Sequence, residues 1–169
     1  DINIIGTTFS PALDRVVFET NHASNNVYAE TLLRTLGKEL MDNASYESSY
    51  KALNEVLKDL GVDASKGVQI QDGSGLSRQN YVSADFFCRF LTAMADSPAY
   101  ADYLRSLPSP GGNGTLQYNM SGQNATLRNR IKAKSGSMNG VRCYSGYILP
   151  SKADGQTIVF SIMTNNCTS

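Results

Sequence analysis

Several kinds of residue are scarce in this 169-residue chain, and each scarcity excludes a class of function. The chain has a single histidine, so a zinc site built from two imidazoles is excluded. Its three cysteines, Cys88, Cys143 and Cys167, lack the short paired spacing of a zinc site, and their odd number argues against a complete disulfide framework. The 15 basic and 15 acidic residues cancel, which argues against nucleic acid as the main partner.

Long apolar runs are absent as well. No run approaches the ~20 residues needed to cross a bilayer, so we expect no transmembrane segment. The first residues lack the basic start and the apolar stretch of a signal peptide, and we expect any such signal to lie outside this chain. Hydrophobic residues make up 41% of the sequence, which is enough for the core of one domain.

The hydrophobic pattern changes from a helical to a strand-like period along the chain. The expected elements are a short strand at 2–9, helices at 11–19, 24–40, 49–60, from 83 onward and at 97–107, a brief strand at 68–70, and strands at 131–137, 141–149 and 157–164. Asn139-Gly140 is typical of a tight hairpin turn between two of these strands. A helical segment followed by a three-stranded antiparallel meander predicts an α+β fold.

Residues 134–137, Lys-Ser-Gly-Ser, lie on the first strand of this meander. A Lys-Ser/Thr-Gly strand is one of three elements that build the site of penicillin-recognising serine enzymes. In such a site Lys134 supplies positive charge for a substrate carboxylate, Ser135 hydrogen-bonds that carboxylate, and Gly136 lets the ligand lie against the strand. The backbone N–H of Ser137 then faces the developing oxyanion. A solvated edge strand would carry the same tripeptide without any function.

A second cluster, Ser24-Asn25-Asn26, opens a predicted helix. Serine is a preferred N-cap, which by itself explains Ser24. The functional interpretation is a Ser-x-Asn element, in which Ser24 relays a proton to the leaving amine and Asn26 hydrogen-bonds a substrate amide. Ser24 precedes Lys134 by 110 residues, and we expect the two clusters to converge across one cleft.

With these two clusters in order, the chain resembles the C-terminal part of the D-alanyl-D-alanine carboxypeptidase/endopeptidase family of low-molecular-mass penicillin-binding proteins (peptidase family S13, DacB type). The resemblance rests on Ser10-Pro11-Ala12-Leu13, Ser24 to Glu30, Asp72 to Arg78 with Asn80, Leu107-Pro108, Gly114-Thr115-Leu116, Lys132 to Ser137, and Gly140-Val141. It implies a penicillin-binding-protein/β-lactamase-like transpeptidase fold and cleavage of D-Ala-D-Ala in peptidoglycan stem peptides through an acyl-enzyme. It also implies inhibition by β-lactams, no metal or organic cofactor, and a place in the periplasm or cell envelope.

The family's nucleophile motif, Ser-x-x-Lys, is expected ahead of the Ser-x-Asn element. The string that fits here, Ser48-Ser49-Tyr50-Lys51, follows Ser24 instead, so we interpret it as a helix cap and a surface lysine. We therefore expect residues 1–169 to form the C-terminal part of a single catalytic domain, without its Ser-x-x-Lys segment and terminal helix, and to be inactive alone. An open sheet edge in such a part predicts association of copies through that edge.

The remaining motifs are weaker. The glycine turn Asp72–Arg78 is family-specific, but its chemistry alone suggests a structural role. Gly73-x-Gly75 and Gly112-x-Gly114 lack the third glycine of a dinucleotide loop, so we expect no nucleotide there. His22 is interpreted as a loop residue, because no acid is placed to complete a triad with it.

Three other functions fit parts of the pattern. These are a non-catalytic module that binds peptidoglycan peptides or penicillin, a piece of a class A-type β-lactamase, and a structural α+β domain with chance motifs. Covalent labelling by penicillin separates the enzyme from the binding module. The Asp72–Arg78 turn disfavours the β-lactamase.

Overall fold

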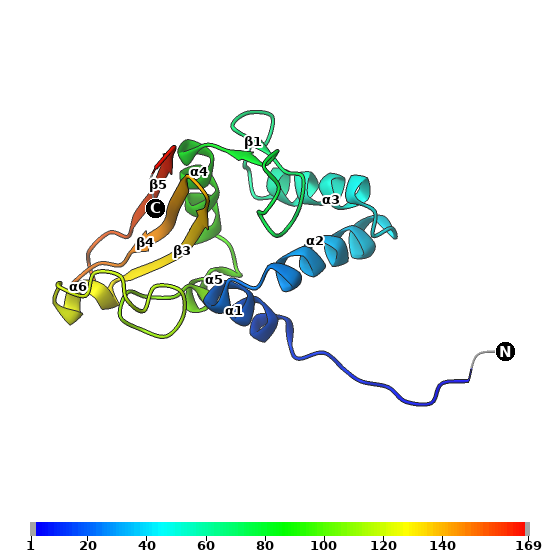
Figure 1. The fold of residues 1–169 in the computed structure, drawn as a ribbon, viewed down its shortest axis with the longest axis horizontal. Helices are drawn as coiled ribbons and strands as arrows, with labels where there is room; N and C mark the ends of the chain where they lie inside the picture. The colour runs from blue at the N-terminus through cyan, green and yellow to red at the C-terminus, as the bar shows by residue number, and fades with distance from the viewer. Residues whose placement is uncertain (1–2, 168–169) are drawn as a thin grey trace.

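The structure is a computed structural model that describes residues 3–167. Its elements are α1 (Leu13–Ala23), α2 (Asn26–Met41), α3 (Tyr46–Asp59), β1 (Val68–Gln69), β2 (Tyr81–Val82), α4 (Ala84–Ala95), α5 (Tyr100–Ser106), α6 (Ala125–Asn129), β3 (Ile131–Met138), β4 (Val141–Ile148) and β5 (Ile158–Asn165) (Figure 1). The predicted α+β order of helices followed by an antiparallel meander is confirmed. The short elements β2 and α6 were not expected.

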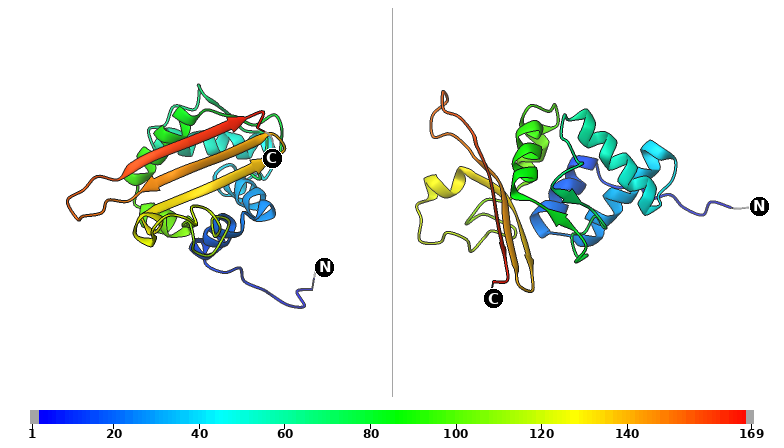
Figure 2. Two further views of the ribbon diagram at one scale, coloured as in Figure 1. Left: turned by 60° about the vertical axis from the view of Figure 1, so that its left-hand side comes forward. Right: turned by 90° about the horizontal axis from the view of Figure 1, so that it is seen from above.

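The sheet is a simple meander in the order β3-β4-β5, so β3 and β5 are its edge strands. The β3–β4 hairpin closes with Met138 opposite Val141, and Gly140 in its turn has a φ of 79°, which glycine adopts at little cost. The right-hand view of Figure 2 shows the sheet nearly edge-on, with α4 (green) on one side and α6 (yellow) on the other. The first edge strand, β3, carries residues 134–137.

The sheet is fixed to the helices by a buried tyrosine. Tyr147 of β4 has no exposed surface, and its O–H donates to the backbone oxygen of Leu91 in α4 at 2.8 Å. The rings of Tyr100 and Tyr103 in α5 meet it edge-on, with centroids 5.4 and 6.5 Å away. Aromatic pairs favour this geometry, so α4, α5 and β4 pack into one core beside β3.

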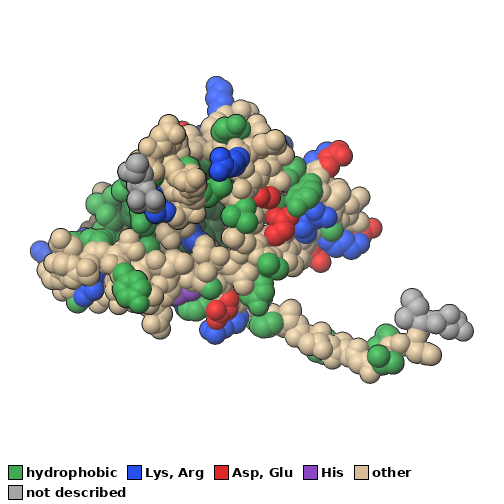
Figure 3. Space-filling view, in the orientation of Figure 1, with side chains coloured by type: hydrophobic (Ala, Val, Ile, Leu, Met, Phe, Trp, Pro, Cys, Tyr) green, Lys and Arg blue, Asp and Glu red, His purple; other side chains and the backbone are tan. Residues whose placement is uncertain are grey.

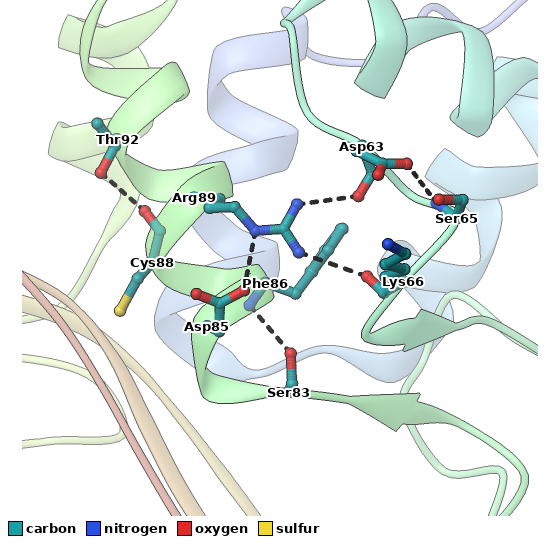
Figure 4. A network of polar contacts seen from close by, with 9 residues as sticks. All are labelled: Asp63, Ser65, Lys66, Ser83, Asp85, Phe86, Cys88, Arg89 and Thr92. Carbon is teal, nitrogen blue, oxygen red and sulfur yellow. Dashed lines mark hydrogen bonds and ion pairs between the residues drawn. The ribbon is translucent and has the colours of Figure 1, made fainter.

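The polar cluster around Arg89 holds α4 to the segment that follows α3 (Figure 4). The Arg89 guanidinium donates to the backbone oxygens of Asp63 at 3.0 Å and Lys66 at 3.4 Å, and it pairs with Asp85 at 3.0 Å. The apolar cluster of Leu57 and Phe86 lies in the same region. This packing joins the α2–α3 pair to the rest of the molecule.

The strand expected at residues 2–9 is not formed. Residue 2 lies outside the described residues, and residues 3–12 are neither helix nor strand. They run away from the body of the molecule (Figure 1), and the apolar side chains of Ile4, Ile5 and Phe9 are exposed. Figure 3 shows the apolar side chains of this segment standing clear of the body, whereas charged side chains gather over α2 and α3. A strand needs a neighbour for its hydrogen bonds, and no strand within residues 3–167 pairs with this segment.

The first helix is also displaced from its expected position. It begins at Leu13 instead of Pro11 and continues through the expected break at 20–23. Packing against α5 carries it further, because Asn21 donates to the Ser106 hydroxyl at 2.7 Å. His22 lies within α1, so it is a helical residue and not a loop residue, and its ring stacks on Phe18 with centroids 3.9 Å apart.

Within residues 3–167, no helix combines the length and the apolar character that a bilayer crossing requires.

Candidate active site

The junction between α1 and α2 lies against the middle of β3. The ammonium group of Lys134 donates to the Ser24 hydroxyl at 2.8 Å, although the two residues are 110 positions apart. The same Nζ donates to the backbone oxygen of Ser135 at 2.7 Å. The two sequence clusters therefore converge at one place.

Ser24 reaches Lys134 because it ends a helix instead of beginning one. It is the C-cap of α1, with φ 52° and ψ 50°, a left-handed conformation that is uncommon outside glycine. The N-cap of α2 is Asn25, whose Oδ1 accepts from the N–H of Tyr28 at 3.1 Å. The alternative interpretation of Ser24 as the N-cap of α2 is therefore excluded, and the Ser24 hydroxyl faces β3.

Lys134 is partly buried and carries no acidic partner. Burial lowers its pKa, because the protein shields the ammonium group from water. None of the ion pairs among residues 3–167 involves Lys134. A positive charge held by a hydroxyl and a carbonyl, without a carboxylate, is suited to bind an anionic group.

Beyond Ala133, the outer edge of β3 presents backbone donors beside this charge. The N–H of Ala133 points to that edge and donates to the Pro108 oxygen at 3.0 Å. Backbone groups alternate between the two sides of a strand, so the N–H groups of Ser135 and Ser137 face the same edge. A carbonyl lying along β3 would meet the N–H of Ser137.

Gly136 lies between these two serines and has space around it. A Cβ placed there would meet the Cys143 Cβ at 3.5 Å, an ordinary contact, and nothing closer. Packing of the sheet therefore does not require glycine at this position. The free space is instead available to a ligand that lies against the strand.

Asn26 is the first residue of α2, two positions after Ser24, and it is exposed. The hydrogen bonds found between residues 3 and 167 include none from its side chain, so the amide is available to a ligand. The structure thus places all six predicted site residues (Ser24, Asn26, Lys134, Ser135, Gly136 and Ser137) around the α1–α2 junction and β3. Their chemical roles stay a prediction.

Thr115 is a neighbour of this site that the sequence analysis did not identify. Its hydroxyl accepts a hydrogen bond from the Ser135 hydroxyl at 3.0 Å, and its N–H donates to the backbone oxygen of His22 at 3.1 Å. The only signal in the sequence was the Gly114-Thr115-Leu116 stretch, which carried part of the resemblance without a role.

The Ser48–Lys51 string lies on α3 and is engaged in local contacts. Lys51 pairs with Glu47 at 2.7 Å on an exposed helix face. Ser48 shares a hydrogen bond of 3.0 Å with the hydroxyl of Ser45, which is the N-cap of α3. Ser49 is fully buried against Gly37. These contacts favour the interpretation as a helix start with a surface lysine.

The Asp72–Arg78 turn is held by its own hydrogen bonds. Burial works to raise the pKa of Asp72, but hydrogen bonds from Asn80, Gly75 and Ser77 outweigh it, and the pKa is lowered. The turn docks on α2, where the Gly73 N–H donates to Glu30 at 2.7 Å. These contacts give the turn a structural role next to the helix that begins with Asn26.

The described residues also bear on whether the chain has a metal-binding cluster or hollows that could hold a ligand. Among the described residues, no three histidine, cysteine or acidic side chains gather in a group that would hold a metal ion. Two open hollows of about 440 and 490 Å³ lie beside β1–β2 and along α4, and neither is lined by Ser24 or Lys134.

Comparison with known proteins identifies the family. The chain belongs to the D-Ala-D-Ala carboxypeptidase 3 (S13) family, whose model matches residues 4–169. It is 32% identical over 170 residues to a D-alanyl-D-alanine carboxypeptidase of Actinomadura sp. (strain R39), covering 98% of this chain and 30% of that protein. It is 36% identical over 167 residues to the penicillin-sensitive carboxypeptidase A of Dictyostelium discoideum, covering 93% of this chain and 31% of the relative.

The fold agrees with this family. The chain superimposes on penicillin-binding protein 4 (dacB) from Haemophilus influenzae, crystallised with a β-lactam, with a TM-score of 0.80 and 24% identity. The match covers 90% of this chain and 35% of that one. The expected penicillin-binding-protein fold is therefore confirmed. The chain spans about a third of the length of the relatives it matches.

Proposed function

We propose that residues 1–169 are the C-terminal part of a single transpeptidase-like catalytic domain in a serine-type D-Ala-D-Ala carboxypeptidase or endopeptidase. Its substrates are peptidoglycan stem peptides. The observation that carries the proposal is the 2.8 Å contact between Lys134 and Ser24 beside the open edge of β3. Membership of the S13 family supports the same activity.

Binding of the peptide end follows from the charges and donors at this edge. The ammonium group of Lys134 and the hydroxyl of Ser135 hold the terminal carboxylate of the substrate. The peptide lies against Gly136, and the Asn26 amide hydrogen-bonds a backbone amide of the substrate. Together these contacts fix the scissile D-Ala carbonyl next to the N–H of Ser137.

The reaction needs a serine nucleophile outside the described residues. Its oxygen attacks the D-Ala carbonyl carbon, and the N–H of Ser137 donates to the oxyanion that develops there. The proton that the nucleophile loses passes through the lysine of its Ser-x-x-Lys motif to Ser24. The C–N bond breaks as the departing nitrogen takes the proton of the Ser24 hydroxyl, which the Lys134 ammonium contacts at 2.8 Å. Water then hydrolyses the acyl-enzyme. β-Lactams would acylate the same nucleophile.

The location and the assembly state are part of the same proposal. The substrate places the enzyme in the periplasm or cell envelope. The open edge of β5 would allow two copies to associate, as edge strands pair readily. Sedimentation of the purified protein tests the second point, since a monomer at all concentrations would contradict it.

The experiment that tests the activity is labelling of the natural full-length protein with a fluorescent penicillin, together with release of D-Ala from an acyl-D-Ala-D-Ala peptide. We expect covalent labelling and peptide cleavage, and no label on the 169-residue chain alone. Reversible binding without a covalent label would favour the binding module. Rapid penicillin hydrolysis would favour the β-lactamase.

Lys51→Ala is the matched control for this experiment. It removes a lysine that pairs with Glu47 at the surface of α3, so we expect normal labelling. Loss of labelling in Lys51→Ala, or stoichiometric acylation of the 169-residue chain at Ser48, would instead make Ser48–Lys51 the nucleophile pair.

A further inference from the structure

Thr115 connects the two halves of the candidate active site. Its N–H donates to the His22 oxygen in the last turn of α1, two residues before Ser24. Its hydroxyl is 3.0 Å from the Ser135 hydroxyl on β3. One residue is thus hydrogen-bonded to both of the elements that carry the predicted site residues.

The segment around Thr115 is held on both sides. Leu116 is buried, and its oxygen accepts from the N–H of Gly111 at 3.2 Å. Gly114 has a φ of 102°, and a Cβ there would lie 3.0 Å from the His22 oxygen. Because both neighbours are fixed, the Thr115 hydroxyl has a defined position opposite β3.

Ser135 needs such a partner for a physical reason. A serine side chain has no second heavy atom on Cβ, so it moves among three rotamers at little cost, whereas β-branched threonine is restricted. Only a rotamer that points to the open edge of β3 lets Ser135 donate to a carboxylate there. The 3.0 Å hydrogen bond to Thr115 favours the rotamer in which the Ser135 hydroxyl meets Thr115, before any ligand arrives.

We propose that Thr115 is a positioning residue, which fixes the Ser135 hydroxyl for donation to the substrate's terminal carboxylate. This inference rests on the proposed function. In the free protein Ser135 donates to Thr115. When a carboxylate binds, the Ser135 proton turns to it, and the Thr115 hydroxyl donates to the Ser135 oxygen. Each hydroxyl can both donate and accept, so the contact survives this exchange.

The test uses steady-state cleavage of an acyl-D-Ala-D-Ala peptide by the natural full-length protein. Thr115→Val keeps the shape and the N–H but removes the hydroxyl, and we expect KM to rise about fivefold to tenfold with kcat within about twofold. Thr115→Ser restores the hydroxyl and should return KM to within about twofold of the wild-type value. Thr126→Val is the matched control, because Thr126 is an exposed residue of α6.

The same Thr115→Val substitution in a Ser135→Thr variant tests whether Thr115 acts through the rotamer of residue 135. Ser135→Thr supplies the branched side chain that restricts the rotamer by itself, so adding Thr115→Val in that background should raise KM by less than about twofold. The inference is overturned if Thr115→Val behaves like Thr126→Val, if Thr115→Ser is as impaired as Thr115→Val, or if the Thr115→Val effect is the same in both backgrounds. Absence of peptidase activity and penicillin labelling in the wild type would instead contradict the proposed function.

Discussion

Two cationic side chains, Arg89 and Lys134, each bridge segments that are far apart in the sequence, but their surroundings differ. The Arg89 guanidinium donates hydrogen bonds to two backbone oxygens and forms an ion pair with the Asp85 carboxylate (Figure 4). The Lys134 ammonium contacts one hydroxyl and one backbone oxygen, and it has no acidic partner among the described residues.

We interpret the difference as one between a structural contact at Arg89 and the proposed ligand-binding contact at Lys134. A neutralised guanidinium with fixed acceptors stabilises the packing of α4, and it has little left to offer a ligand. An ammonium group that is partly withdrawn from water and not neutralised remains attractive to an anion. Its hydroxyl partner Ser24 is exposed, so the contact is open to a substrate.

The largest expected effect comes from exchanging each cation for alanine in the full-length protein. Lys134→Ala should lower kcat/KM for an acyl-D-Ala-D-Ala peptide by more than about a hundredfold, because it removes the proposed partner of the substrate carboxylate and the charge beside Ser24. Arg89→Ala should leave kcat/KM within about twofold and lower the free energy of unfolding by about 1–3 kcal/mol. Steady-state kinetics and urea titration of both variants measure these two effects. Equal losses of activity in Lys134→Ala and Arg89→Ala would contradict the proposed difference between the two cations.

Two glycines of the sheet, Gly136 on β3 and Gly146 on β4, also differ in whether packing or the proposed ligand binding requires them. Gly146→Ala should lower the free energy of unfolding by about 3 kcal/mol, because a Cβ there would lie 2.1 Å from the Lys132 oxygen. Gly136→Ala should leave the melting temperature nearly unchanged and reduce peptide cleavage at least about tenfold, because its methyl group would occupy the space proposed for substrate. A marked fall in the melting temperature of Gly136→Ala would show that packing requires this glycine.

The pH dependence of substrate binding tests the state of Lys134. Burial lowers its pKa from the usual 10.5, so its charge is lost at a lower pH than for a free lysine. As the pH is raised, we expect KM for the carboxylate substrate to begin rising below pH 10.5. In Lys134→Arg this rise in KM should occur at a higher pH, since arginine stays charged. An identical alkaline rise in KM in both proteins would assign it to another group.

His22 should give the smallest effect. Burial lowers its pKa below 6.5, so in mildly acidic solution the unfolded chain binds a proton that the folded chain does not. Stability conferred by the neutral ring is therefore lost as the pH falls through 6.5. Melting temperatures at pH 7.5 and 5.5 should differ less for His22→Phe, which keeps the stacking on Phe18, than for the wild type. An unchanged difference would exclude His22 as a contributor.

Local rules predicted much of the fold. The Asn139-Gly140 turn and the strand-like patterns around it predicted the boundaries of all three long strands to within a few residues. This was possible because turn chemistry and strand period are encoded in adjacent positions. The same rules failed at residues 3–12 and 20–23. There the outcome depended on partners distant in sequence, namely a neighbouring strand, which residues 3–167 do not supply, and the contact of Asn21 with Ser106, which forms.

The sequence by itself determined the two motif clusters, their order and the family to which the chain belongs, since these depend only on which residues stand at which positions. Only the tertiary structure decided that Ser24 ends a helix in a left-handed conformation, that Lys134 reaches it across 110 residues, and that Thr115 holds Ser135. The physical reason is that hydrogen bonds between remote segments form only after packing of the core has fixed both backbones. Tyr147 and the helices around it provide that packing.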